Sequence, residues 1–415
     1  MPKLHHRRDR CQLCESKALT MIFSLAPTPP ANAFVPASER SREQPYFPLD
    51  VFQCEDCHHV QLLDVVDPAV LFENYVYVSG TSPAFVKHFE DYAATLCDRL
   101  GPADDSLIID IGSNDGTLLS FLKQRGYRVL GIDPARDIAA NATAAGIETL
   151  PSFFTPKLAR KIVAERGPAT IVTANNVFAH AEDLYSIASG IADLLSPDGV
   201  FTFEVSYLVD VFQDVLFDTI YHEHMAYHAV GPLQRFFTRV GLELFSAERV
   251  SSHGGSLRGY VQKAEGPHAS DGTVEDLIEA EKQLGLDRSA TLKEFGDRIE
   301  RLRDRFKATL QELRDAGNSI AGYGAPAKAT TLLHHFGIEL GTLEYIIDDS
   351  PLKQGLYSPG QHIPVLSSDI LSDDPPDILV ILAWNFADVI MKNNSAFAER
   401  GGRFLIPLPD VQLCP

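Results

Sequence analysis

The chain has 415 residues, of which 45% are apolar and 22% are charged, and this composition excludes a disordered or fibrous protein. At roughly 150 residues per domain, the length predicts two or three domains. The formal net charge is −20, because 56 Asp and Glu outnumber 36 Lys and Arg. Such an acidic surface repels phosphate backbones, so we expect no nucleic-acid partner.

Apolar runs and cysteines are both sparse along the chain. No apolar run approaches the ~18 residues that a membrane span needs, and no apolar core follows the charged N-terminus, so we expect neither membrane association nor a secretory signal. Six cysteines do not make a disulfide scaffold, and in the cytosol paired cysteines indicate metal or redox chemistry. We predict a cytoplasmic protein, and a monomer is compatible with the sequence.

Four of the cysteines form two Cys-x-x-Cys pairs, Cys11 with Cys14 and Cys54 with Cys57. Two such pairs supply the four thiolates that a tetrahedral Zn²⁺ prefers. They leave no open position for a substrate, so we predict a structural zinc site. The alternatives are four unrelated buried thiols or a redox pair.

A Gly-rich turn lies between a predicted strand over residues 107–111 and a predicted helix that starts at residue 117. The turn reads Gly112-Ser-Asn114-Asp-Gly116, and its glycines permit tight turning and a close approach of the backbone to a ligand. The alternative is an ordinary connection between a strand and a helix.

Two acids flank this turn. Asp133 ends the next predicted strand, where doubly wound folds place a carboxylate on ribose hydroxyls. Asp110 lies at the end of the first predicted strand, where an ammonium group can be bound. The pattern departs from the dinucleotide motif and resembles the first motif of class I S-adenosylmethionine methyltransferases.

Polar residues also follow a later strand, predicted over residues 169–174. Asn175, Asn176 and His180 come directly after it. Because the ends of parallel strands face the ligand crevice in open α/β sheets, we expect these three residues near the cofactor.

The densest titratable cluster of the chain spans residues 217–228 and contains Tyr221, His222, Glu223 and His224. In one interpretation, His222 and His224 alternate on a strand and chelate a metal. In another, one histidine is a general base that Glu223 or Tyr221 supports. A polar surface loop is the third alternative. The spacing does not choose among them.

A second Gly-rich polar turn contains His253, Ser256 and Arg258, and its cation suits an anionic group.

The last third of the chain repeats the pattern of strand, Gly-rich turn and helix that is predicted for the middle. Apolar residues at steps of three and four predict an amphipathic helix over residues 291–316. A strand, a Gly-rich turn at Gly324 and a helix with Lys328 follow, and later strands are predicted at residues 343–349 and 378–383. Helix N-termini favour phosphates, and Lys328 and Lys353 add charge. This region therefore binds a dinucleotide or a sugar nucleotide, or it is a structural repeat only.

Together these motifs resemble the family of sugar C-methyltransferases that act on nucleotide-linked keto-sugars, which includes the tetronitrose C-3′-methyltransferase. The resemblance covers nearly the whole chain. In chain order, the motifs are Cys11-x-x-Cys14 with Cys54-x-x-Cys57, Pro29-Pro-Ala-Asn32, Tyr75-Val-Tyr77-Val-Ser79, Asp110-Ile-Gly-Ser-Asn-Asp-Gly116, Asn176 with His180, Tyr221-His-Glu-His224 and His253-Gly-Gly-Ser-Leu-Arg258.

The resemblance implies an α/β protein with three domains: a zinc-binding domain over residues 1–70, a class I S-adenosylmethionine methyltransferase domain over residues 71–265, and a Rossmann-like domain over residues 266–415 that binds the nucleotide-sugar. It implies an enzyme that uses S-adenosylmethionine and structural Zn²⁺. The implied substrate is a dTDP- or GDP-linked 4-keto-deoxysugar, methylated next to its ketone at C3, in the biosynthesis of a branched sugar.

The resemblance also implies roles for individual residues. His224 would take the proton next to the ketone, and Tyr221, Glu223 and His180 would support the base or the enolate oxygen. The implied cofactor contacts are Asp110, Gly112, Asn114, Gly116, Asp133, Phe153, Asn175, Asn176 and Tyr75. The implied substrate contacts are Tyr77, Ser82, His253, Ser256, Arg258, Gly324, Ala325, Lys328, Asp349 and Lys353.

One position departs from the family pattern. The family usually has glycine after its last zinc cysteine, whereas this chain has His58, which must adopt the positive φ of the knuckle at some cost or replace a thiolate as a ligand. Two other functions stay open at this stage. One is an NAD-dependent nucleotide-sugar oxidoreductase that uses the turn at Gly324, and the other is a non-catalytic, zinc-stabilised binding protein.

Overall fold

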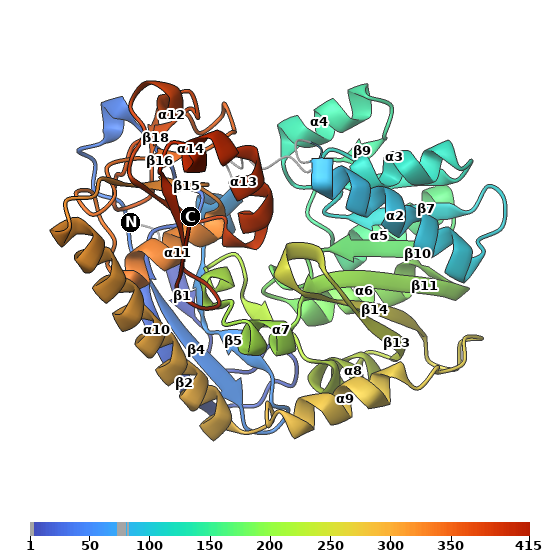
Figure 1. Ribbon diagram of the computed structural model, residues 1–415. Coiled ribbons are helices and arrows are strands. Elements are labelled where there is room, and N and C mark those ends of the chain that lie inside the picture. The colour runs from blue at the N-terminus through green and yellow to red at the C-terminus, as the bar shows by residue number, and fades with distance from the viewer. Residues whose placement is uncertain (1–3, 73–79, 81–82) are drawn as a thin grey trace.

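The computed structural model describes residues 4–72, 80 and 83–415. Its elements form two halves that face each other (Figure 1). One half is the middle unit, residues 83–283, built on a seven-stranded sheet. The other half combines the N-terminal unit, residues 4–72, with the C-terminal unit, residues 289–414.

The seven strands of the middle unit lie in the order β13-β14-β11-β10-β7-β8-β9. The five from β11 to β9 are parallel, and the β13–β14 hairpin is antiparallel at one edge. All five residues of β7 are buried, as a parallel strand covered on both faces requires. The bounds are β7 (Leu107–Ile111), β8 (Arg128–Ile132), β9 (Thr149–Leu150), β10 (Ala169–Asn175), β11 (Leu195–Ser206), β13 (Leu242–Val250) and β14 (Ser256–Lys263).

Helices cover both faces of this sheet. Ile108 packs into one apolar cluster with Tyr92 and Leu119, and its neighbour Ile109 packs into another with Ile162, because successive strand residues point to opposite faces. The helices are α2 (Pro83–Leu100), α3 (Thr117–Gln124), α4 (Arg136–Ala144), α5 (Pro156–Arg166), α6 (Leu184–Leu194), α7 (Leu208–Gln213), α8 (Val230–Arg239) and α9 (Thr273–Gln283).

The N-terminal unit contains an antiparallel sheet in the order β12-β5-β4-β2. Its edge strand β12 belongs to the middle unit in sequence, so the two units share this sheet. A separate two-stranded ribbon pairs β1 with β6. The bounds are β1 (His5–Arg7), β2 (Leu19–Thr28), β4 (Phe47–Cys54), β5 (Val60–Leu62), β6 (Asp64–Val66), α1 (Pro68–Phe72) and β12 (Ala226–Tyr227).

The C-terminal unit begins with the long helix α10 (Ser289–Asp315), which confirms the helix predicted from apolar spacing. A sheet in the order β18-β16-β15-β19-β20-β21 follows, parallel except for its last strand. The bounds are β15 (Ile320–Tyr323), α11 (Ala327–Phe336), β16 (Ile346–Ile347), β18 (Val365–Leu366), α12 (Ile370–Asp373), β19 (Ile378–Ile381), α13 (Ala387–Asn393), α14 (Ser395–Glu399), β20 (Arg403–Ile406) and β21 (Gln412–Cys414).

The three units are tied together by strand pairing and helix packing. β3 (Val35–Pro36) pairs with β17 (Leu356–Tyr357), so a segment of the N-terminal unit adds to the C-terminal unit. β2 packs on α10 and α11, and α9 packs on α8 and β13. The expected division at residues 70 and 265 stays a prediction, and these joints run across it. No helix in the described part of the chain has the length and apolarity to cross a membrane.

Candidate active site

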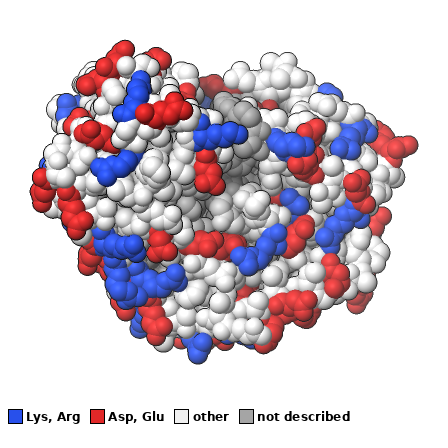
Figure 2. Space-filling view, in the orientation of Figure 1, with Lys and Arg blue, Asp and Glu red and all other residues white. Residues whose placement is uncertain are grey.

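A cavity of about 560 Å³ lies where the three units meet. Its wall contains the Gly-rich turn after β7, residues that follow β10, the segment 219–224, Asn32 of the N-terminal unit and the N-terminus of α11. The space-filling view is hollowed between the two halves of the molecule (Figure 2). The predicted cofactor turn and the predicted catalytic cluster therefore open into one space.

The Gly-rich turn has the backbone shape that its sequence predicts. Gly112 and Gly116 have φ values of 73° and 78°, in the left-handed region. A Cβ on Gly112 would clash with the side chain of Val177, and a Cβ on Gly116 would lie 2.8 Å from Ile147 Cγ2. Both positions therefore require glycine. Asn114, with φ 48°, also lines the cavity.

The two acids that flank the turn both line the cavity. Burial raises the pKa of Asp110 to about 7, although its Oδ1 accepts a hydrogen bond from Thr173 Oγ1 at 2.6 Å. Burial also raises the pKa of Asp133, whose oxygens accept from the backbone N–H groups of Asn114 and Ala135, each at 2.9 Å. A cationic ligand would restore the charge of such desolvated carboxyl groups.

These residues fit S-adenosylmethionine. Asp110 would hold its ammonium group and Asp133 its ribose, and Phe153, which is 59% exposed on the cavity wall, would contact its adenine. The side-chain oxygen and nitrogen of Asn175 are buried on the same wall without a partner among the described residues, as a polar ligand group would require. Asn176, at φ 57°, lines it as well.

His224 is held in one tautomer. Its Nδ1 lies 2.8 Å from the carbonyl oxygen of Thr219, which only accepts, so Nδ1 carries the proton. In the neutral ring, Nε2 then carries the lone pair, and this lone pair accepts a hydrogen bond from the Tyr221 hydroxyl at 2.9 Å. The His180 ring lies 4.8 Å from the His224 ring. His224 also lines the cavity, and a neutral imidazole in this tautomer is suited to proton abstraction through Nε2.

Glu223 is buried beside this histidine in sequence and lines the same cavity. Its Oε1 accepts a hydrogen bond from Asn32 Nδ2 at 3.0 Å. Burial raises the pKa of Glu223 to about 7, and the Asn32 hydrogen bond opposes this rise. His222 faces elsewhere, with Nε2 3.2 Å from the Phe47 carbonyl oxygen. The alternative that His222 and His224 chelate one metal therefore finds no support in their placement.

The segment over residues 219–224 is hydrogen-bonded to the C-terminal unit. Two neighbouring buried threonines of α11 act as donors: Thr331 Oγ1 donates to the Ile220 carbonyl at 2.8 Å, and Thr330 Oγ1 donates to the Ala31 carbonyl at 2.9 Å. The same helix presents Lys328 to the cavity. α11 thus aligns residues from all three units.

Lys328 and Lys353, which are predicted substrate contacts, both line the cavity. Lys328 Nζ lies 3.9 Å above the Trp384 ring and 3.9 Å from Asp218 Oδ2, and burial lowers its pKa. Lys353 Nζ donates to the Ala325 carbonyl at 2.8 Å. Gly324, Ala325 and Asp349 do not belong to the described cavity wall, and Asp349 accepts from the Tyr323 hydroxyl instead.

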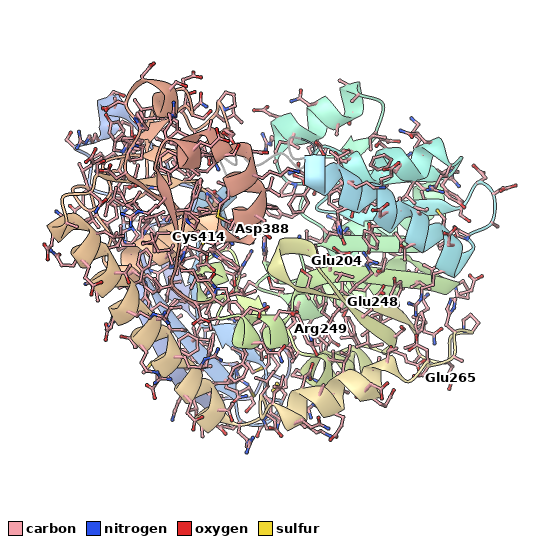
Figure 3. The ribbon with its side chains drawn as sticks, in the orientation of Figure 1. Glu204, Glu248, Arg249, Glu265, Asp388 and Cys414 are labelled. Atoms are coloured by element: carbon pink, nitrogen blue, oxygen red, sulfur yellow. The ribbon has the colours of Figure 1, made fainter. Side chains whose placement is uncertain are left out.

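Arg258 and Ser256 are placed differently from the prediction. Both lie on β14, and Arg258 Nε and Nη2 donate to Glu204 Oε1 at 2.8 and 2.5 Å. Figure 3 labels Glu204 and Glu248, which both accept from Arg258, on the sheet of the middle unit. Ser256 Oγ donates to the Ser252 carbonyl at 3.0 Å. Arg258 looked free for an anion because its acidic partner is 54 residues away in sequence.

Four further predicted residues lie outside the description. Tyr75, Tyr77 and Ser82 are not among the described residues, and neither is the His253 side chain. Conversely, the prediction missed Asn32 as a site residue, although the Pro-Pro-Ala-Asn motif that contains it was recognised. It also missed Thr219, whose contact with His224 Nδ1 is made by the backbone carbonyl and therefore gives no side-chain signal.

The four predicted metal ligands come together. The Sγ atoms of Cys11, Cys14, Cys54 and Cys57 all lie within 4.8 Å of one another. Four thiolates at this spacing fit a closed tetrahedral Zn²⁺ site. His58 adopts φ 63°, like Glu15 at φ 65° after the first pair, so it takes the strained knuckle conformation that was expected and does not join the ligand cluster.

Comparisons with known proteins cover most of the chain. Residues 11–72 match a zinc binding domain, residues 85–247 a methyltransferase domain and residues 251–409 the C-methyltransferase C-terminal domain. C-methyltransferase NovU of Streptomyces niveus is 34% identical over 405 residues, which are 98% of this chain and 96% of NovU.

Two solved structures align with less than half of the chain. Magnesium protoporphyrin IX methyltransferase of Synechocystis PCC 6803 with bound SAM is 15% identical, with a TM-score of 0.33, over 43% of this chain and 79% of its own. The PH0226 protein of Pyrococcus horikoshii OT3 is also 15% identical, with a TM-score of 0.37, over 46% and 97%.

Proposed function

We propose that this chain, which belongs to the sugar C-methyltransferase family, methylates a carbon next to the ketone of a nucleotide-linked 4-keto-deoxysugar, with C3 as the reacting carbon. The matches confirm the predicted α/β methyltransferase fold, the S-adenosylmethionine-dependent C-methyltransferase activity and the zinc-binding domain. The substrate and the residue roles are the proposal. The observation that carries it is the single tautomer of His224 in a cavity shared with the cofactor turn.

S-adenosylmethionine supplies an electrophilic methyl group when it is bound. Carbon becomes nucleophilic only after deprotonation beside a carbonyl, so the protein must provide a base. In the proposal, His224 Nε2 takes the proton from C3, and the electron pair of the broken C–H bond becomes the enolate. That carbon then forms the new C–C bond with the methyl group as the bond between methyl and sulfur breaks, and the electron pair of the broken bond stays on the sulfur of the departing S-adenosylhomocysteine. Tyr221 and His180, whose rings adjoin that of His224, support the enolate oxygen.

The other end of the cavity supports the nucleotide. Lys328 and Lys353 lie there with the N-terminus of α11, and cations together with a helix N-terminus suit a diphosphate. The protein has a net charge of −20, so an anionic substrate needs such a local site. We propose that the C-terminal unit binds a dTDP- or GDP-linked sugar here.

Deuterium exchange tests the base separately from methyl transfer. In deuterated buffer without S-adenosylmethionine, the enzyme should exchange the C3 hydrogen of a dTDP- or GDP-linked 4-keto-6-deoxysugar. His224→Ala should lose this exchange and about 10²–10⁴-fold in methyl transfer. Calorimetry should show an unchanged affinity for S-adenosylhomocysteine. Undiminished exchange in His224→Ala would move the base elsewhere, and absence of exchange and methylation with every keto-sugar would refute the substrate class.

A further inference from the structure

The structure points to a role for the N-terminal unit in the chemistry itself: we propose that Asn32 is a positioning residue that orients the Glu223 side chain and favours its ionised form. This proposal deepens the proposed function and rests on it for the identity of the reaction. It adds that the zinc-binding unit completes the active site.

The contact itself is direct. Asn32 Nδ2 donates to Glu223 Oε1 at 3.0 Å, across 191 residues of sequence. Both side chains line the cavity, and Glu223 is 3% exposed. An amide N–H that donates to a carboxyl oxygen favours the charged form of that group. With Oε1 held by Asn32, Oε2 is left for the reacting end of the substrate or for the charge that His224 gains as it takes a proton.

The segment that presents Asn32 is fixed at several points. The Ala31 carbonyl accepts from Thr330 on α11, and the Ala33 carbonyl accepts from Gln44 Nε2 at 2.8 Å. β3, which follows directly, pairs with β17 of the C-terminal unit. A side chain held through its neighbours in this way keeps one geometry, as a positioning role requires.

The strand β2 connects this segment to the zinc ligands. Its first residue, Leu19, pairs with Cys54. Its last residue, Thr28, pairs with Phe47, and Thr28 lies four residues before Asn32 in the sequence. Ten residues of extended strand span roughly 33 Å. The zinc ligands therefore lie at one end of the paired strands β2 and β4, and the chain that leaves the other end of β2 leads to Asn32 at the cavity.

Charge at the cavity determines how Glu223 titrates. Burial raises its pKa and the Asn32 hydrogen bond lowers it, so removal of Asn32 should raise it further. The other titratable groups on the cavity wall come from its own segment, from the loops after β7, β8 and β10, and from the C-terminal unit; they are Tyr221, His224, Asp110, Asp115, Asp133, His180, Lys328 and Lys353.

The pH profile of methyl transfer is the first test. Asn32→Leu should lower kcat with little change in KM and move the acidic limb of kcat upward by about one pH unit, the equivalent of one charge-assisted hydrogen bond. Asn32→Asp should move it further, because two carboxyl groups would then share the site. Gln44→Leu is the matched control, since it removes a hydrogen bond to the same segment without contacting Glu223. An unmoved limb in Asn32→Leu, or an equal shift in Gln44→Leu, would overturn the proposal.

A second measurement does not depend on activity. The folded-state pKa of Glu223 lies above its usual value of 4.5, so its contribution to stability falls as pH rises from there to about 7 and then levels off. In Asn32→Leu the fall should continue above pH 7, so the difference in Tm from wild type should widen there. In a Glu223→Gln background the difference should not vary with pH. A pH-independent difference in both backgrounds refutes the inference, whereas an inactive wild-type enzyme refutes only the proposed reaction.

Discussion

Replacing Arg258 with Met should destabilise the middle unit and leave the KM for the nucleotide-sugar unchanged. The guanidinium donates twice to Glu204 Oε1 and lies 4.1 Å above the Tyr92 ring, and the Glu204 side chain is 2% exposed. Removing one partner of a buried ion pair costs about 3–5 kcal/mol, because the remaining buried charge loses its counter-charge. Without Arg258, Glu204 keeps only its hydrogen bonds with His88 and Ser252 among the described residues. In a folding unit of about 150–250 residues, that corresponds to a loss of roughly 6–20 °C in Tm.

The loss should depend on pH in a defined direction. Burial alone would raise the pKa of Glu204, but the hydrogen bond from His88 and the charge of Arg258 hold it below its usual value. In the wild type this carboxylate therefore contributes stability above its unfolded-state pKa, and that contribution is lost as pH falls through the folded-state pKa. Without Arg258 the folded-state pKa rises, so the Tm difference should be largest near neutral pH and should shrink in acid.

Thermal unfolding followed by circular dichroism at several pH values measures this difference. The double variant Glu204→Gln with Arg258→Met should recover part of the loss, since it leaves no unpaired charge. KM is compared at a temperature where the variant is folded. An Arg258→Met enzyme with a wild-type Tm and a raised KM would contradict the placement of Arg258 and assign it to substrate binding.

Two further predictions concern the ligands. Removing zinc with a tight chelator should lower Tm and abolish methyl transfer, and adding zinc back should restore both, because structural zinc contributes about 10–16 kcal/mol to the folding of small modules. Metal analysis should find one zinc per chain. Full activity of the metal-free protein would contradict the link from zinc to Asn32. The affinity for S-adenosylhomocysteine should rise from about pH 6 to 8, because the ammonium group of this ligand favours ionised Asp110, whose pKa is about 7. Calorimetry should show this rise in the wild type and a flat profile in Asp110→Asn.

The features that the sequence predicted are those whose signals are local. The turn from β7 to α3 needs glycine at two nearby positions, and the sequence places Gly112 and Gly116 there. α10 buries one face, so its apolar residues recur at steps of three and four. The four cysteines lie in two short motifs whose spacing already matches one ion. In each case the partners are neighbours in sequence, or the chemistry of the residue type admits few alternatives.

The features that escaped prediction depend on partners far apart in sequence. An arginine after a Gly-rich turn has the same local sequence whether it binds a phosphate or pairs with Glu204. The register of β14 on β11 places Arg258 opposite Glu204 and so decides its partner. Asn32 lies in a recognised motif, but its contact with Glu223 exists only because β2 and α11 bring the units together. The shared sheet that contains β12 likewise has no local signature, because a two-residue strand carries almost no pattern.

The two ends of the cavity suit ligands of opposite charge, so one cavity can bind a cationic cofactor and an anionic substrate together. At the middle unit, burial raises the pKa of Asp110, so a cationic group bound there favours the ionised form of this carboxyl group. At the C-terminal unit, burial lowers the pKa of Lys328, and the charge of Asp218 opposes this. Asp218 is itself fully buried and accepts from Trp384 Nε1 at 2.6 Å, which holds it 3.9 Å from Lys328 Nζ. In the proposed function, the cationic cofactor and the anionic nucleotide then each repair a desolvated charge, and the reacting carbon is left between them, beside His224.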